Sequence, residues 1–577
     1  MATKSRRGSK QDQAKSNGHA SRFTNDASGA VSPTISSYLI QRLLDYKVRH
    51  LFGVPGDYVL TFYQQLQNSP IEVIGTTAEN CAGFAADAYA RVRGMGAVCI
   101  TYCVGGLNLV NPIAGAYAEK SAVVVISGAP GERERRNDAL IHHKVRTFTT
   151  QLEIFEKLTC ASTVLDDPRT ALHEIDRVLE ACWRQKRPVY IELPRDMVDV
   201  RPPHLHLPAA PITKTNADAL GEALQEAAAM IRASKNPVIL ADVEVHRFGL
   251  QKQLVELVER SGIPVAATIL GKSVISEKHP LYLGIYEGAM GRREVQQAVE
   301  NSDCVIMLGT FLTDINLGIF TAKLDRRKTI EITSNKVQVH HHYYEGIAFT
   351  DFLQALLRAD LRNGRRDAPP QTRPVPPKTA AKSGDRVTVR SLFQRLDQFL
   401  SDDMMVICDV GDCLFGAVDL TIHKRTEFLA SAYYTSMGFA VPAALGAQVA
   451  NPNHRALVLV GDGAFQMTGQ ELSTMVRLKL DPIVVVLNNH GYTTERFILD
   501  GPFNDITEWN YDQIHRLLGA GMGFVVKTVG DLDKALAAAL RNTKSFSILN
   551  VHLDKLDHSQ ALHRLGEHLA NKLKGKR

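Results

Sequence analysis

Residues 457–495 read LVLVGDGAFQMTGQELSTMVRLKLDPIVVVLNNHGYTTE, and this stretch decides the fold. Two apolar runs, residues 457–460 and 483–487, predict buried strands, and the spacing of apolar residues between them predicts a helix. The first strand ends at a tight Gly-Asp-Gly turn and the second at Asn488-Asn489, so polar residues follow both strands. Because ligands bind at the carboxyl ends of strands in open parallel sheets, the pattern predicts a ligand site there.

The polar residues at this strand edge have the chemistry of a metal and phosphate site. Mg²⁺ prefers oxygen ligands and is often shared with a ligand phosphate. Asp462 offers a carboxylate oxygen, Asn489 an amide oxygen and Gly491 a backbone carbonyl. The helix predicted after Gly463 directs free N–H groups toward a phosphate. We therefore expect a Mg²⁺ ion held by Asp462, Asn489 and Gly491.

The same stretch resembles the thiamin diphosphate-binding motif of thiamin-dependent enzymes. A GDG turn or an NN pair alone is more often structural than functional, but the two at this spacing form a specific signal. The continuation Gly491-Tyr492-Thr493-Thr494-Glu495 resembles the 2-oxo-acid decarboxylase branch of that family, which includes pyruvate, indolepyruvate and phenylpyruvate decarboxylases. The resemblance implies thiamin diphosphate and Mg²⁺ as cofactors. It assigns cofactor binding to Glu79, Asp412, Met437, Gly461, Asp462, Gly463, Ala464, Asn489 and Gly491.

Length and composition are those of a multidomain globular protein. The chain has 577 residues, 45% of them apolar, and we expect neither a membrane span nor a signal peptide. The eight cysteines are scattered and form no CxxC pair, which favours reduced thiols in a cytoplasmic protein over a zinc site or a disulfide framework. The net charge of +6 is concentrated at the two ends of the chain, so it does not predict a nucleic-acid partner.

Alternating strand and helix patterns predict an α/β protein with three doubly wound domains. Residues 1–33 are polar and predict a disordered tail. We expect a first domain at 34–205, a middle domain at 206–362, a Pro-rich linker at 363–386 and a third domain at 387–577. In the family that the chain resembles, these correspond to pyrimidine-binding, middle and diphosphate-binding domains.

Four separate segments carry the residues that the resemblance assigns to proton transfer. Glu79, at the start of a predicted helix rich in Ala and Gly, matches the glutamate that lies against the cofactor's aminopyrimidine ring. Asp57, the adjacent His142 and His143, and Glu495 match the residues that move protons around the decarboxylation step. In this family the pyrimidine and diphosphate halves of one site come from different subunits. The resemblance therefore implies a homodimer or homotetramer with shared active sites.

The resemblance implies non-oxidative decarboxylation of a 2-oxo acid to an aldehyde and CO₂. An acetolactate synthase-like carboligase shares the glutamate and the metal motif. A cofactor-binding regulatory paralogue shares the binding site but has no need of the proton-transfer residues. Neither alternative is expected to keep the histidine pair together with the glutamate of the GYTxE segment, so both rank below the decarboxylase.

Substrate choice is predicted from departures near the pocket. Pyruvate-selective members carry a Trp shortly after a Gly-Asp pair and an Ile before the catalytic glutamate, whereas this chain has Leu414 and Thr494. Together with Ile498, these two residues are assigned to the substrate pocket. We expect an aromatic or branched-chain 2-oxo acid, such as phenylpyruvate or indolepyruvate, with pyruvate as the alternative. The loop after the histidines, residues 144–146 (KVR), also departs from the family pattern.

Overall fold

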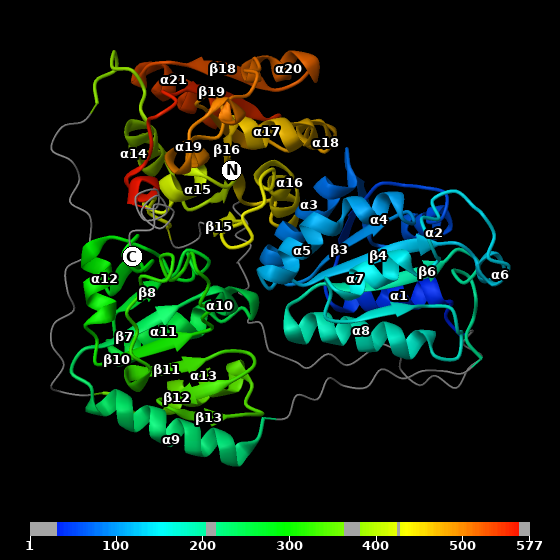
Figure 1. Ribbon diagram of the computed structural model, residues 1–577, viewed down its shortest axis with the longest axis horizontal. Coiled ribbons are helices and arrows are strands. Elements are labelled where there is room, and N and C mark those ends of the chain that lie inside the picture. The colour runs from blue at the N-terminus through cyan, green and yellow to red at the C-terminus, as the bar shows by residue number, and fades with distance from the viewer. Residues whose placement is uncertain (1–31, 204–214, 363–380, 424–426, 565–577) are drawn as a thin grey trace, which may run out of the picture.

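The structure is a computed structural model that describes residues 32–203, 215–362, 381–423 and 427–564 (Figure 1). The expected tail and most of the expected linker lie outside these described residues. Figure 1 shows three α/β units, coloured blue to cyan, green, and yellow to red, each built on its own sheet. Among the helices of the described ranges, none is long and apolar enough to cross a membrane.

The first domain has a parallel six-stranded sheet in the order β2-β1-β3-β4-β6-β5. Its strands are β1 (His50–Gly53), β2 (Glu72–Gly75), β3 (Gly96–Ile100), β4 (Val123–Ala129), β5 (Ser162–Val164) and β6 (Val189–Pro194). Its helices are α1 (Ile35–Asp45), α2 (Leu60–Gln67), α3 (Glu79–Arg93), α4 (Val104–Asn108), α5 (Val110–Ala118), α6 (Glu132–Arg136), α7 (Thr150–Glu156) and α8 (Ala171–Gln185). The chain proceeds outward in both directions from β1, so the topological switch point, where such sheets bind ligands, lies between β1 and β3.

The third domain repeats this strand order as β15-β14-β16-β17-β19-β18, again with all strands parallel. Its strands are β14 (Met404–Cys408), β15 (Glu427–Ala430), β16 (Arg455–Gly461), β17 (Ile483–Asn488), β18 (Met522–Val526) and β19 (Ser547–His552). Its helices are α14 (Val389–Phe399), α15 (Asp412–Ala417), α16 (Ala440–Ala450), α17 (Asp462–Thr468), α18 (Leu472–Arg477), α19 (Thr493–Ile498), α20 (Ile514–Leu517) and α21 (Val529–Arg541), with short 3-10 turns η2 (Gly469–Glu471), η3 (Pro502–Asn504) and η4 (Tyr511–Gln513). The switch point of this sheet lies between β14 and β16.

The middle domain has a seven-stranded sheet in the order β13-β12-β11-β10-β7-β8-β9, in which the pairings of β12 are antiparallel. Its strands are β7 (Pro237–Ala241), β8 (Val265–Ala267), β9 (Tyr282–Ile285), β10 (Cys304–Leu308), β11 (Thr329–Ile332), β12 (Val337–Val339) and β13 (His342–Tyr344). Its helices are α9 (Ala217–Ala233), α10 (Val243–Arg247), α11 (Gln251–Ser261), α12 (Arg293–Glu300) and α13 (Phe349–Arg358), with the 3-10 turn η1 (Arg326–Lys328). The prediction of three α/β domains is confirmed.

The small-residue helix α3 packs against α16 of the third domain of the same chain (Figure 1). A Cβ at Gly446 would lie 1.9 Å from the carbonyl oxygen of Ala85, so only glycine permits this approach. The rings of Phe84 and Phe439 meet edge to face across the same contact, with centroids 5.8 Å apart. The alanines and glycines of α3 therefore serve contact between domains within one chain.

His246, on α10, is held as a neutral imidazole. Its Nε2 lies 2.9 Å from the carbonyl oxygen of Lys272, and its Nδ1 lies 3.1 Å from the side-chain nitrogen of Gln251. A carbonyl only accepts and an amide nitrogen only donates, so Nε2 carries the proton and Nδ1 does not. Burial, helped by the adjacent Arg247, lowers the pKa of His246 to about 4.

Because His246 is buried in its neutral form, we expect the folded protein to lose stability in mild acid. In the unfolded chain, a histidine side chain has a pKa of about 6.5. The contribution of His246 to folding stability is therefore complete above that pH and is lost as the pH falls toward 4. We expect the Tm of the wild type to fall more steeply between pH 6.5 and 4 than that of His246→Gln, measured by scanning calorimetry. Equal slopes in the two proteins would contradict this assignment.

Candidate active site

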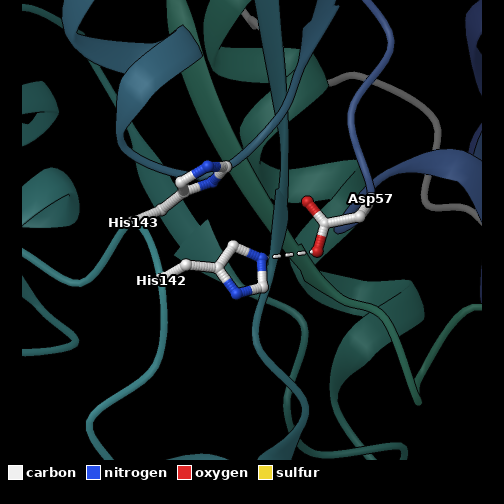
Figure 2. A group of neighbouring side chains, drawn as sticks. All are labelled: Asp57, His142 and His143. Carbon is white, nitrogen blue, oxygen red and sulfur yellow. Dashed lines mark hydrogen bonds and ion pairs between the residues drawn. The ribbon is translucent and has the colours of Figure 1, made fainter.

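Asp57, His142 and His143 meet at the carboxyl edge of the first sheet (Figure 2). Asp57 follows β1, and the two histidines lie in the loop between α6 and α7. Nε2 of His142 lies 2.7 Å from Oδ2 of Asp57, and polar atoms of all three side chains lie within 4.8 Å of one another. The side chains of His142 and Asp57 are 59% and 45% exposed, so a small molecule can reach them.

The cluster keeps Asp57 ionised and His142 in place. Partial burial opposes ionisation, but the hydrogen bond from His142 and the nearby imidazoles lower the pKa of the Asp57 carboxyl below its ordinary value. The ring of Tyr58 stacks on His142 with centroids 5.0 Å apart, and its hydroxyl donates to the backbone carbonyl of His142 at 3.3 Å. The buried Nδ1 of His143 has no hydrogen-bond partner among the described residues. The arrangement can donate and accept protons at one place.

Glu79 lies at the same edge, at the first position of α3. Its Oε2 accepts a hydrogen bond of 2.9 Å from the Asn108 side chain. Gly105 lies between Glu79 and Thr101, because a Cβ on Gly105 would be 3.5 Å from Oε1 of Glu79 and 3.5 Å from Thr101. Thr101 in turn packs against Gly56, the residue before Asp57. The residues predicted for pyrimidine activation and for proton transfer therefore flank the end of β3. Asn108 has no sequence motif that could have indicated its contact with Glu79.

The predicted metal residues also come together, at the carboxyl ends of the neighbouring strands β16 and β17, beside the switch point of the third sheet. Oδ1 of Asp462 accepts from the N–H of Gly463 at 2.7 Å, and Oδ2 accepts from the N–H of Gly491 at 3.0 Å. Burial raises the pKa of Asp462 to about 6, and Oδ1 of Asn489 is buried without a hydrogen-bond donor among the described residues. A buried carboxylate beside an unsatisfied amide oxygen fits a hard divalent cation.

The glycines of this turn allow close packing beside the metal residues. A Cβ on Gly463 would lie 2.6 Å from the ring of Tyr492, whereas one on Gly461 would meet nothing within 4 Å. Gly491 has a φ of 128°, which disfavours any other residue. Ala464, in the first turn of α17, is buried. The space beside Gly461 therefore leaves room at the start of α17 for a bound group.

Glu508 braces the loop that carries Asn489, and sequence reasoning did not identify it. Its Oε1 accepts from the side chain of Asn488 at 2.8 Å, and its Oε2 lies 3.4 Å from Nδ1 of His490. Glu508 thus contacts the residues on both sides of Asn489. His490 has a φ of 62°, a conformation that needs such support in a non-glycine residue.

Met437 lies in the segment between β15 and α16 and is 37% exposed. Two buried carboxylates hold this segment. Asp409 accepts from the N–H of Gly438 at 3.1 Å, and Glu119 of the first domain accepts from the N–H of Tyr434 at 2.9 Å. An exposed apolar side chain on a well-anchored segment suits the predicted support for a cofactor ring.

The remaining predicted residues lie around α15 and α19. Asp412 is buried and accepts hydrogen bonds from the backbone and hydroxyl of Ser559, so it anchors the segment that leads into the helical residues 560–564. Leu414 is fully buried in the core of the third domain. Thr494 lies against the loop before α15, because a Cβ on Gly411 would be 3.2 Å from its Oγ1.

Glu495 and Ile498 follow Thr494 on α19, and they are exposed and half-buried, respectively. Across the described ranges, no hydrogen bond or ion pair joins Asp57, His142, His143 or Glu79 to Asp462, Asn489 or Glu495. One chain therefore presents two clusters, one on the first domain and one on the third.

Comparisons with known proteins agree with the three-domain fold. Residues 33–154 match the thiamine pyrophosphate enzyme N-terminal TPP binding domain, residues 224–359 the central domain, and residues 409–551 the C-terminal TPP binding domain. The chain therefore belongs to the thiamin diphosphate-dependent 2-oxo-acid decarboxylase family, whose cofactor is thiamin diphosphate.

Three relatives cover nearly the whole chain. The chain is 36% identical over 528 residues to indole-3-pyruvate decarboxylase of Azospirillum brasilense. This match covers 90% of this chain and 95% of the relative. It is 35% identical over 542 residues to alpha-keto-acid decarboxylase of Mycolicibacterium paratuberculosis, and the match covers 92% of this chain and 96% of the relative. The identity to alpha-keto-acid decarboxylase of Mycobacterium tuberculosis is 36% over 544 residues, and this match also covers 92% of this chain and 96% of the relative.

Proposed function

We propose that the protein is a carboxy-lyase that uses thiamin diphosphate and Mg²⁺ to convert a bulky 2-oxo acid into an aldehyde and CO₂. The observation that carries this proposal is the hydrogen bond of 2.7 Å between His142 and Asp57, with His143 beside it. Releasing an aldehyde after loss of CO₂ requires a proton donor at the reacting carbon, and acid–base groups at one accessible place meet this need. Bound thiamin diphosphate supplies the electron sink for the decarboxylation.

The third domain supplies the anchoring residues in this proposal. The carboxylate of Asp462, the amide oxygen of Asn489 and the backbone carbonyl of Gly491 would hold Mg²⁺ and, through it, the diphosphate. Met437 would support the rings. Glu495, exposed on α19, would face the substrate with the Asp57 cluster of another chain.

We place each active site between two copies of the chain, in a homodimer or a homotetramer built from such dimers. Apolar side chains are exposed beside both clusters: Val104 and Leu107 on α4 are 50% and 38% exposed, and Met437 and Met467 are 37% and 42% exposed. A two-fold axis that brings the first domain of one copy to the third domain of the other would cover these side chains and complete two sites at once.

We further place the enzyme in the cytoplasm. All eight cysteines are free, and seven of them are buried. Free thiols are typical of a reducing compartment.

A coupled aldehyde assay with pyruvate, 2-oxoisovalerate, phenylpyruvate and indolepyruvate tests this function. We expect free aldehyde and CO₂ from all accepted substrates, with kcat/KM higher for phenylpyruvate or indolepyruvate than for pyruvate. Formation of acetolactate from pyruvate without free aldehyde would favour the carboligase instead. Tight cofactor binding without turnover of any of the four acids would favour a regulatory paralogue.

Thr494 is expected to influence the choice of substrate. Thr494→Ile adds bulk beside Gly411 and narrows the space before Glu495. We expect the ratio of kcat/KM for phenylpyruvate over pyruvate to fall about tenfold, which is the size of effect that added methylenes produce in a pocket. The exposed Thr507→Ile is the control. An unchanged ratio in the Thr494 variant would remove this residue from the pocket.

A further inference from the structure

The loop that carries His142 and His143 has no helix or strand of its own. It occupies residues 137–149, between the end of α6 and the start of α7. His143 has a φ of 68°, which is disfavoured for a residue with a Cβ. The two imidazoles therefore depend on side-chain contacts for their positions.

Lys144 makes the densest set of these contacts. Its Nζ donates to Oδ1 of Asp138 at 2.6 Å, to the backbone carbonyl of Asp138 at 3.3 Å and to that of Ala139 at 3.3 Å. These three acceptors match the three protons of an ammonium group. The Nζ atom also lies 4.3 Å from the centroid of the Phe148 ring. The side chain is only 7% exposed, which is uncommon for lysine.

These contacts link the two sides of the loop. Asp138 and Ala139 precede the histidines, whereas Phe148 follows them, and the backbone N–H of Lys144 closes a turn by donating to Ile141 at 3.3 Å. The histidines also have direct support, since the ring of Tyr58 stacks on His142 and its hydroxyl donates to the backbone carbonyl of His142 at 3.3 Å.

We propose that Lys144 is a positioning residue that clamps the loop and so holds His142 against Asp57 with His143 beside them. The proposal rests on the proposed function, because it gives the histidines their purpose. Lys144 does not bind the substrate carboxylate, since its protons are used within the loop. Loss of the ammonium leaves the carbonyls of Asp138 and Ala139 without this donor, and the loop opens.

The chain offers a matched control two residues away. Arg146 is on the same loop and carries the same charge, but it is exposed. Lys144→Met removes the donors and keeps the apolar stem, and Arg146→Met removes one positive charge from the same loop. If the charge alone attracted an anionic substrate, the two variants would behave alike.

We expect kcat/KM of the holoenzyme for phenylpyruvate to fall about 100-fold in Lys144→Met, as a displacement of about 1 Å in a catalytic group can produce. Arg146→Met should stay within about threefold of the wild type, as expected of an exposed residue outside the contacts. Binding of thiamin diphosphate with Mg²⁺, measured by calorimetry, should be unchanged in both, because the metal residues are in the third domain.

The pH profile separates positioning from a general loss of structure. The groups that face Asp57 are His142 and His143 from the loop and Tyr58 from its own segment, with Glu134 and Arg195 beyond Tyr58. When His142 moves away, the pKa of Asp57 rises, so the acidic limb of kcat/KM moves to higher pH in Lys144→Met. It should not move in Arg146→Met. A smaller folded fraction would lower activity at every pH without moving the limb.

Two further variants cover the case in which Lys144→Met fails to fold. Lys144→Arg keeps a cation with donors and should recover part of the activity. Asp138→Asn changes an 85% exposed side chain, so it should fold and show the same shift of the acidic limb to a lesser degree.

Hydrogen exchange followed by mass spectrometry gives a readout without turnover. Residues 137–149 should lose protection in Lys144→Met and keep it in Arg146→Met. Unchanged exchange, kcat/KM and pH profile in Lys144→Met would overturn the proposal, as would an equal loss in Arg146→Met. Failure of the wild type itself to release aldehyde would instead refute the proposed function, and the exchange result would still decide whether Lys144 holds the loop.

Discussion

Glu79→Gln is expected to lower kcat about 1,000-fold while changing the affinity for thiamin diphosphate only a few-fold, as for the loss of a catalytic acid–base group. Glu79 begins α3 and accepts a hydrogen bond of 2.9 Å from Asn108. The amide has nearly the same shape as the carboxylate and can keep that contact, but it cannot take up a proton. Steady-state aldehyde release gives kcat, and calorimetric titration of the apoprotein gives the affinity.

Glu72→Gln is the matched control for this experiment. Glu72 begins β2 at the opposite edge of the same sheet, and its side chain is 62% exposed. It should retain wild-type kcat. Full activity of Glu79→Gln would remove Glu79 from the active site, and lost cofactor binding with normal turnover of the loaded fraction would assign it a binding role only.

Asp462→Asn is expected to weaken Mg²⁺-dependent binding of thiamin diphosphate about 100-fold or more, because it removes the one full negative charge among the three proposed metal ligands. In the wild type, the two carboxylate oxygens of Asp462 accept hydrogen bonds from the N–H groups of Gly463 and Gly491. The amide of the variant retains the shape of this side chain. The measurement is a calorimetric titration of cofactor into apoprotein at fixed Mg²⁺. Excess Mg²⁺ should restore part of the binding.

Asp403→Asn controls for the loss of one charge from the same domain. Asp403 is exposed and directly precedes β14, so it lies at the amino edge of the sheet, whereas Asp462 lies at the carboxyl edge. The control should bind the cofactor as the wild type does. Equal affinity in Asp462→Asn and the wild type would show that the cation is held elsewhere.

The central strands of the fold could be predicted because their signal is local. The apolar runs at 457–460 and 483–487 became β16 and β17, and the helix predicted to start at Glu79 became α3, which begins at that residue. Strands β5, β9, β12, β13 and β15 were not predicted. They are three or four residues long and lie at or next to sheet edges, and runs this short carry a weak local signal.

The site residues with a motif could be predicted, and those that hold them could not. Asp462 and Asn489 stand at the ends of two recognisable strands, whereas Glu508 reaches Asn488 and His490 from a loop without a motif. Asp412 belongs to a recognisable Gly-Asp motif, yet both its carboxylate oxygens accept hydrogen bonds from Ser559. This contact spans 147 residues, and the local sequence does not encode it.

The most direct test of the account is complementation between two inactive variants. Glu79→Gln damages the cluster on the first domain and Asp462→Asn the cluster on the third, so co-expressed chains with different purification tags can form mixed dimers. If each site is shared between copies, a mixed dimer has one intact site of its two, so purified mixed dimers should show about half of wild-type aldehyde release and an unfractionated random mixture about a quarter. Activity no higher than that of either variant alone, in purified mixed dimers, would contradict the shared site.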